Sequence, residues 1–140
     1  MTVVVDTSLL AAAVNQRDPD HASSQALMDR VLAGEQGRPV TSEHVLDEGL
    51  TLLRRRPGRP EVSDAFATFF FGDEKEPPPI RLVLTTWADV VAAYRLHQQH
   101  YERGLSFTDC ILASLADSLD APIASLDHDF DGIVPRIAPS

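Results

Sequence analysis

Several residue types that mark common protein classes are scarce in this chain of 140 residues. Its single cysteine, Cys110, excludes an intrachain disulfide and a zinc site built from several cysteines. Its single lysine is Lys75, so all but one of its 12 basic residues are arginine. No apolar run approaches the roughly 18 residues of a membrane-spanning helix. No basic segment followed by an apolar stretch marks a signal peptide. We therefore expect a cytoplasmic protein with no membrane segment.

Motifs of several enzyme classes are also missing. The chain has neither a phosphate-binding glycine-rich loop nor a Gly-x-Ser-x-Gly turn, and its five histidines form no metalloprotease pattern. The net charge of −9 opposes long-range attraction to nucleic acid, although bound divalent cations would reverse the local field of an acidic pocket. The basic charge is clustered, and the cluster is either a solvated helix end or a contact for RNA or a partner. Its members are Arg54, Arg55, Arg56 and Arg59.

Short apolar strands alternate with helical segments along the chain, an order typical of an α/β sandwich with a mostly parallel central sheet. The expected strands cover residues 2–5, 38–40, 80–84, 123–126 and 134–137. The expected helices cover residues 7–14, 19–33, 43–56, 61–71, 87–101 and 107–119. Asp18 followed by Pro19 is the expected start of the second helix. The length predicts a single domain over residues 1–140.

Four carboxylates stand at the ends of these elements or on their apolar border. Asp6 and Asp127 each follow an expected strand, Asp109 opens the last helix, and Glu48 borders the apolar stripe of the third helix. Because ligands bind beyond the carboxyl ends of parallel strands, one acidic pocket at one sheet edge is geometrically plausible. Two carboxylates about 5 Å apart repel by roughly 3 kcal/mol at an effective dielectric near 20. A shared proton or a bound divalent cation would relieve that repulsion.

Each of these acids also has an ordinary explanation, which the sequence leaves open. Asp6 can cap the following helix, Asp127 can cap a turn, and Glu48 can be a solvated helix charge. The segment Ser106-Phe107-Thr108-Asp109 has the pattern of a capping box, a role compatible with metal binding. Nearby hydroxyl groups would be suited to orienting the carboxylates or bound water. They belong to Thr7, Ser8, Ser106 and Thr108.

The segments around these acids resemble those of PIN-domain ribonucleases, and within them the toxin subunits of VapBC-type toxin–antitoxin pairs. The matching segments are residues 3–8, 45–50, 105–109 and 126–130, so the resemblance extends over nearly the whole chain. It implies a three-layer α/β/α PIN-like fold and a metal-dependent endoribonuclease, a hydrolase. It implies Asp6 and Asp109 as the principal ligands of Mg²⁺, or alternatively Mn²⁺, with Glu48 and Asp127 completing the site partly through water. The implied partners are RNA as substrate, a small antitoxin and a second copy in a homodimer.

Other functions stay open at this point. One is a housekeeping RNA-processing PIN nuclease without an antitoxin, and another is a catalytically inactive PIN-like interaction module. A phosphoacceptor receiver domain is disfavoured, because it needs a lysine late in the chain and Lys75 lies in an expected loop. Asp129 and Asp131 are further acids that can enter the site or alter its charge. The aromatic face of residues 66–71 is expected to be partly exposed for a partner.

Overall fold

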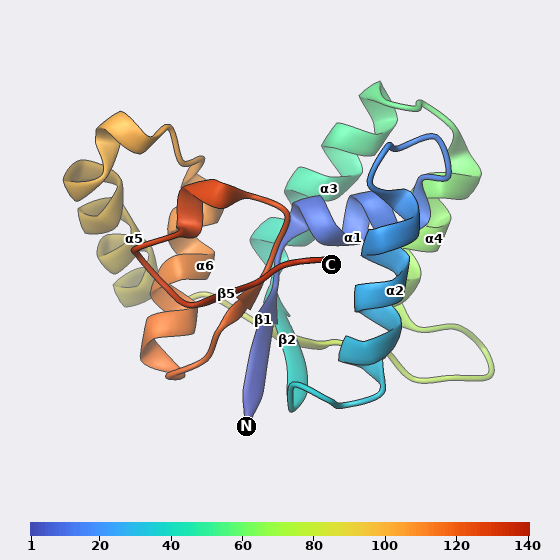
Figure 1. The fold of residues 1–140 in the computed structure, drawn as a ribbon, viewed down its shortest axis with the longest axis horizontal. Coiled ribbons are helices and arrows are strands. Elements are labelled where there is room, and N and C mark those ends of the chain that lie inside the picture. The colour runs from blue at the N-terminus through green and yellow to red at the C-terminus, as the bar shows by residue number, and fades with distance from the viewer.

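Strands and helices alternate through all 140 residues of the computed structural model (Figure 1). The strands are β1 (Thr2–Val5), β2 (Arg38–Ser42), β3 (Arg81–Val83), β4 (Ile123–Ala124) and β5 (Arg136–Ile137). The α-helices are α1 (Thr7–Val14), α2 (His21–Leu32), α3 (Glu43–Arg55), α4 (Pro60–Phe71), α5 (Trp87–Gln99) and α6 (Phe107–Ser118). Two short 3-10 turns, η1 (Tyr101–Arg103) and η2 (His128–Phe130), follow α5 and β4. No helix is both long and apolar enough to cross a membrane.

The five strands form one sheet in the order β3-β2-β1-β4-β5, and every neighbouring pair is parallel. The chain builds outward from β1 through β2 to β3 and then returns to the other side of β1 with β4. The strand order therefore reverses between β1 and β4. In parallel sheets this reversal opens a crevice beyond the carboxyl ends of the two strands, where ligands bind. Asp6 and Asp127, which follow these strands, thus border the same crevice.

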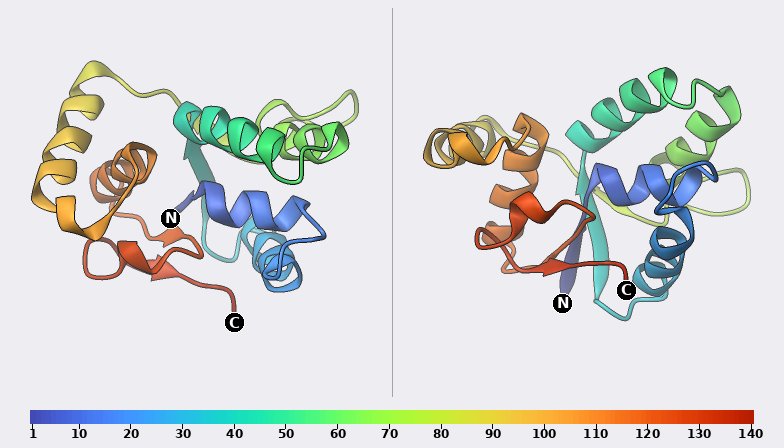
Figure 2. Two further views of the ribbon diagram at one scale, coloured as in Figure 1. Left: turned by 90° about the horizontal axis from the view of Figure 1, so that it is seen from above. Right: turned by 45° about the horizontal axis from the view of Figure 1, so that its top comes forward.

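Helices cover both faces of the sheet, which confirms the expected three-layer α/β/α fold. Helices α5 and α6 lie on one side of β1 and β2, whereas α1 to α4 lie on the other (Figures 1 and 2). The central strand is correspondingly apolar on both faces, since Val3, Val4 and Val5 are all fully buried.

Helices α3 and α4 form a hairpin whose contact depends on one glycine. A Cβ on Gly49 would overlap the ring of Phe66, so the absence of a side chain lets the two helices approach each other. Phe66 and Phe70 are buried, Phe69 is half-buried against the core, and Phe71, 67% exposed, projects into solvent. The expected partly exposed aromatic face is therefore wrong for Phe66 and Phe70, which belong to the core.

Two helix boundaries differ from the sequence expectation by two residues, and the other differences in helix boundaries are of one residue. The second helix begins at His21, not at Pro19, because the Asp18 carboxylate accepts a hydrogen bond from the Asp20 amide at 2.8 Å. That bond makes a turn and delays the first helical residue. Helix α5 ends at Gln99, and Tyr101, its expected last residue, begins η1 instead.

Candidate functional site

Asp6 is the most deeply buried acid of the site, with 2% of its surface exposed at the junction of β1 and α1. Its Oδ1 accepts from the Thr7 amide at 2.7 Å, so it also caps α1. Its Oδ2 accepts from the Ser8 and Ser125 hydroxyls at 2.9 and 2.6 Å. Burial raises the pKa of Asp6, against the lowering by these three hydrogen bonds, and the charge of Glu48 raises it further. The carboxylate of Asp6 is thus fixed by three hydrogen bonds, but no positively charged side chain compensates its charge.

Ser125 is a site residue that the sequence analysis missed. It is fully buried after β4, where its hydroxyl donates to Asp6 and accepts from the Asp127 amide at 2.9 Å. One hydroxyl therefore joins the two acids that follow β1 and β4. The available signal is the short spacing Ser125-Leu126-Asp127 at a strand end, which mirrors Asp6-Thr7-Ser8 in reverse order.

Asp109 reaches the same pocket from the first turn of α6, with 9% of its surface exposed. Burial, together with the charges of Asp6 and Asp127, raises the pKa of Asp109 to about 7, although hydrogen bonds with Ser106 act in the opposite sense. The expected capping box is present, since Asp109 Oδ2 accepts from the Ser106 amide at 2.9 Å. The capping role and the pocket role therefore coexist in this residue.

Glu48 and Asp127 complete the acidic pocket with less burial. Glu48 is half-buried on α3, while its neighbour Asp47 is exposed. The charge of Glu48 raises the pKa of Asp6. Its Oε2 lies 3.4 Å from the Ser106 hydroxyl, which joins α3 to the start of α6. Asp127 is half-buried and caps η2 by accepting from the Asp129 amide at 2.8 Å. The fold thus places all four acids within electrostatic reach of one another.

The four nearby hydroxyls divide into two pairs. Ser8 and Ser106 donate to the carboxylates of Asp6 and Glu48. The hydroxyl of Thr7 is buried without a hydrogen-bond partner, and that of Thr108 donates to none of the four acids. Only the serines orient carboxylates directly.

The two extra acids, Asp129 in η2 and Asp131 directly after it, have different surroundings. Asp131 is held by Arg136 on β5, whose hydrogen bonds lower the pKa of Asp131 to about 2. The Asp129 amide supports Asp127, and its carbonyl accepts from Arg103 at 2.8 Å. Asp131 therefore forms a structural ion pair with Arg136 and does not belong to the group of four acids.

The donor set of the pocket suits a hard divalent cation. Carboxylate oxygens are the ligands that Mg²⁺ takes, usually one or two of them together with several waters. No three acidic, histidine or cysteine side chains converge closely enough to hold an ion by themselves. The arrangement therefore fits an ion held by a pair of carboxylates and water better than one enclosed in a protein cage. A cation would also offset the burial and the repulsion between the acids, which together keep the pKa values of Asp6 and Asp109 high.

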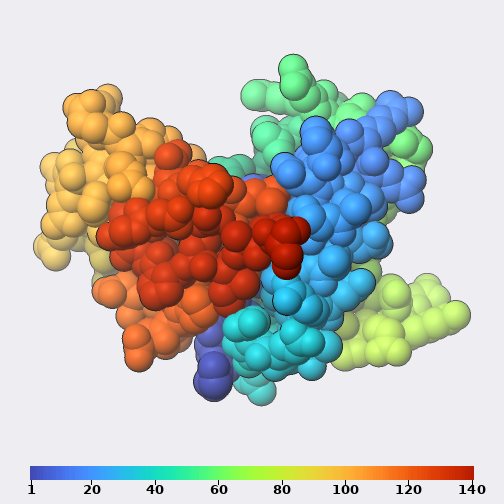
Figure 3. Space-filling view, in the orientation of Figure 1, coloured from blue at the N-terminus to red at the C-terminus, as the bar shows by residue number.

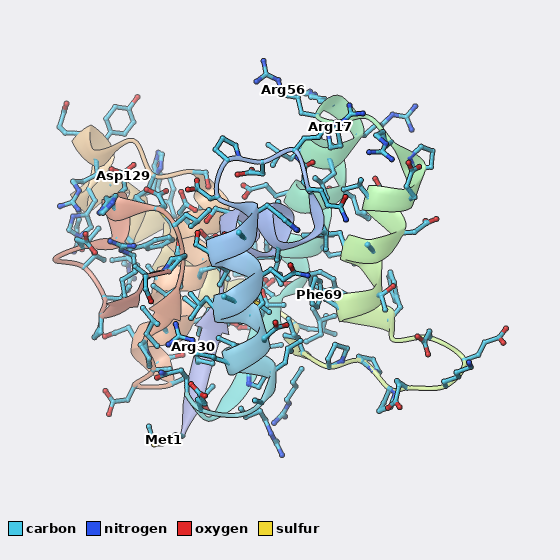
Figure 4. The ribbon with its side chains drawn as sticks, turned by 45° about the vertical axis from the view of Figure 1, so that its right-hand side comes forward. Met1, Arg17, Arg30, Arg56, Phe69 and Asp129 are labelled. Carbon is cyan, nitrogen blue, oxygen red and sulfur yellow. The ribbon has the colours of Figure 1, made fainter.

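The surface is hollowed on the side where β1 ends. Figure 3 shows a notch between the part of the molecule formed by α5, α6 and η2 and the part that contains α3. The arginine cluster lies at the far end of α3. Arg55 and Arg56 line a hollow with Arg17, and Arg17 and Arg56 project from the same end of the molecule (Figure 4). Arg54 and Arg59 line a second hollow, where Arg59 pairs with Glu61.

A family model described as the PIN domain matches residues 3–134 of the chain. The chain belongs to the PIN domain family. A VapC ribonuclease from Archaeoglobus fulgidus is 28% identical over 131 residues, which cover 93% of this chain and 80% of that protein. The family assignment agrees with the order of the acidic segments and with the parallel sheet.

Two solved structures share the fold of this chain. VapC20 of Mycobacterium tuberculosis, a sarcin-ricin loop cleaving toxin, superposes with a TM-score of 0.77 at 29% identity, covering 91% of this chain and 92% of that one. VapBC2 from Rickettsia felis, bound to a promoter DNA fragment, gives a TM-score of 0.70 at 14% identity over the full length of both chains. At that identity the second likeness concerns the PIN fold alone.

Proposed function

We propose that this PIN protein is a Mg²⁺-dependent endoribonuclease and the toxin of a VapBC-type toxin–antitoxin pair. The observation that carries the proposal is the pair Asp6 and Asp109, two buried acids at the sheet crevice whose pKa values are both raised. Such a pair is costly without a counter-charge and is typical of a functional site. The likeness to a VapC ribonuclease and to a sarcin-ricin loop cleaving toxin supports RNA as the substrate.

Free acceptor positions on the acids allow this role. A carboxylate has about four acceptor sites. Asp6 uses three of them within the protein, which leaves one on Oδ1, and Asp109 uses one. We therefore assign Asp6 and Asp109 as direct ligands of Mg²⁺ or Mn²⁺, with Glu48 and Asp127 acting partly through water.

The negative charge of the four acids makes RNA binding and cleavage depend on a bound metal ion. A divalent cation held by these acids would supply an activated water as the nucleophile and a positive charge beside the leaving oxygen. Hydrolysis would leave a 5′-phosphate and a 3′-hydroxyl. Without the ion, the clustered acids and the net charge of −9 repel the RNA backbone, so the acids make binding and cleavage depend on the metal.

The test is cleavage of a labelled RNA mixture by the wild type and by Asp109→Asn, with Mg²⁺ and with EDTA. We expect cleavage only by the wild type and only with metal. Cleavage by the wild type in EDTA, or full activity of the variant, would contradict the assignment of the acids as a metal centre.

The partner is proposed to be a small antitoxin, because solved structures with the same fold include toxin–antitoxin complexes. Co-expression with the product of a short neighbouring gene that encodes a DNA-binding protein should suppress cleavage. Absence of such a gene would favour the housekeeping nuclease.

The arginine cluster is proposed to contact RNA or this partner. A double variant, Arg55→Glu with Arg56→Glu, would raise KM for RNA in the first case and weaken only inhibition in the second.

A further inference from the structure

A buried arginine outside the acidic pocket is linked to two of the acids through Ser125. The side chain of Arg136, on the edge strand β5, is only 8% exposed. Its Nε and Nη2 donate to the two carboxylate oxygens of Asp131 at 2.7 and 3.2 Å, and its Nη1 donates to the Ser125 carbonyl at 3.0 Å. A buried guanidinium is costly unless its donors are paired. Its Nη2 also lies 2.9 Å from Nδ1 of His128. Every nitrogen of the guanidinium therefore has a partner within the protein, which accounts for its burial.

Ser125 transmits the position of Arg136 to the pocket. Its amide donates to the Ile137 carbonyl at 3.1 Å, while its carbonyl accepts from Arg136, so β5 holds this residue on both sides. Its hydroxyl donates to Asp6 at 2.6 Å and accepts from the Asp127 amide at 2.9 Å. A shift of the Ser125 backbone would therefore move the hydroxyl that supports both acids.

The bonds to Asp131 hold the other end of the same turn. Asp127 lies in the turn between Ser125 and Asp131. Arg136 bonds to Ser125 and to Asp131, so its side chain spans the turn that presents Asp127. Arg103 on η1 approaches the turn from the solvent side and donates to the Asp129 and Asp131 carbonyls at 2.8 and 2.6 Å. The bidentate contact with Asp131 adds geometric specificity that a single hydrogen bond lacks.

We propose that Arg136 is a positioning residue for the acidic pocket: it holds the turn from Ser125 to Asp131 so that Asp6 and Asp127 keep the geometry that a divalent cation requires. This inference rests on the proposed function, because it assumes that the pocket binds the cation. Arg136 contacts neither the ion nor RNA. Ser125 is the direct partner of Asp6, and loss of such a partner typically changes metal affinity or activity by about 10–100-fold. Arg136 acts through Ser125, so we expect its loss to have an effect at the lower end of that range.

The test is calorimetric titration of the purified protein with Mn²⁺, comparing the wild type with Arg136→Met. We expect the dissociation constant to rise about 10-fold in this variant, and less in Arg136→Lys, which keeps the charge but not the fork. The matched control is Arg30→Met, which removes an exposed arginine from α2 and should leave the affinity unchanged. Circular dichroism and thermal unfolding establish that each variant is folded.

Cleavage kinetics separate positioning from RNA binding. At fixed Mg²⁺ we expect Arg136→Met to lower kcat with KM for RNA unchanged, whereas a higher KM at unchanged kcat would overturn the proposal. Should Arg136→Met fail to fold, Asp131→Asn carries the test, with an affinity loss of a few fold expected. If the wild type binds Mn²⁺ and the folded variants bind it with the same affinity, the positioning role of Arg136 is wrong but the proposed metal chemistry stands. A wild type that binds no Mn²⁺ overturns the proposed metal chemistry as well.

Discussion

The N-termini of α5 and α6 have nearly the same local structure and yet differ in role. Helix α5 opens with Thr86-Trp87-Ala88-Asp89, and α6 opens with Ser106-Phe107-Thr108-Asp109. In both, the cap hydroxyl accepts from the amide three residues on, and the acid at that position accepts from the cap amide. Both are complete capping boxes with an aromatic residue in the first helical position.

The difference between them comes from the layer that each helix occupies. Helix α6 packs against β1, β2 and β4, so Asp109 is carried to the sheet crevice and faces Asp6 and Asp127. Helix α5 packs on the outer side of α6 and buries only Ala93, which leaves Asp89 beside solvent. A capping box therefore fixes where a helix begins, and topology decides whether its acid also becomes part of a site.

The strongest way to break this comparison is to remove each acid's charge and measure RNA cleavage. Asp109→Asn should lower kcat/KM by more than about 100-fold, because even partners outside the ligand set cost up to that much. Asp89→Asn is the matched control and should cleave like the wild type. Equal losses in the two variants would mean that the α6 acid matters only as a cap.

The same two variants should change the free energy of unfolding in opposite directions relative to the wild type, by amounts that depend on pH. An acid whose pKa is higher in the folded state binds more protons when folded, so stability falls as pH rises between the two pKa values. For Asp109 this window runs from 3.8 to about 7. Without divalent cations, Asp109→Asn should therefore be more stable than the wild type at pH 7.5, by on the order of 2 kcal/mol after allowance for solvent screening. The gain should shrink towards pH 4.

Urea unfolding in EDTA, followed by circular dichroism, measures this effect. Asp89→Asn should instead lose about 0.5 kcal/mol at pH 7.5, because it removes a charge that favours the helix N-terminus. A pH-independent loss of stability in Asp109→Asn would show that its carboxylate is not strained by its neighbours.

The cap hydroxyls provide a smaller contrast. Ser106→Ala and Thr86→Ala should each cost about 1 kcal/mol of unfolding free energy, because each removes an N-cap. Only Ser106 also contacts Glu48, at 3.4 Å, so only Ser106→Ala should lower kcat/KM, by about threefold, since the bond is long. The same drop in Thr86→Ala would trace the effect to helix fraying.

The acids, the layers and the nearby hydroxyls of Ser8 and Ser106 could be predicted from sequence, whereas the supports that come from distant parts of the chain could not. Asp6 and Asp127 stand next to strands that alternate with helices, and that order alone brings them to one sheet edge. The link through Ser125 depends on a pairing between residues 119 positions apart. The contact of Arg136 with the Ser125 carbonyl depends on a two-residue edge strand, where periodicity carries almost no signal. Local patterns therefore locate the acids, and tertiary contacts determine what holds them.

The aromatic residues that begin the two helices should show the smallest difference. Phe107 is 37% exposed and its ring meets that of His44 on α3 at 6.4 Å, whereas Trp87 is 78% exposed. Phe107→Ala should cost about 1 kcal/mol of unfolding free energy through lost apolar burial and the edge-on ring contact. Trp87→Ala should stay within about 0.5 kcal/mol of the wild type, as exposed positions usually do. Urea midpoints give both values, and a larger loss at Trp87 would mean that the α5 N-terminus is covered in solution, which would make the two helix starts more alike than their exposures indicate.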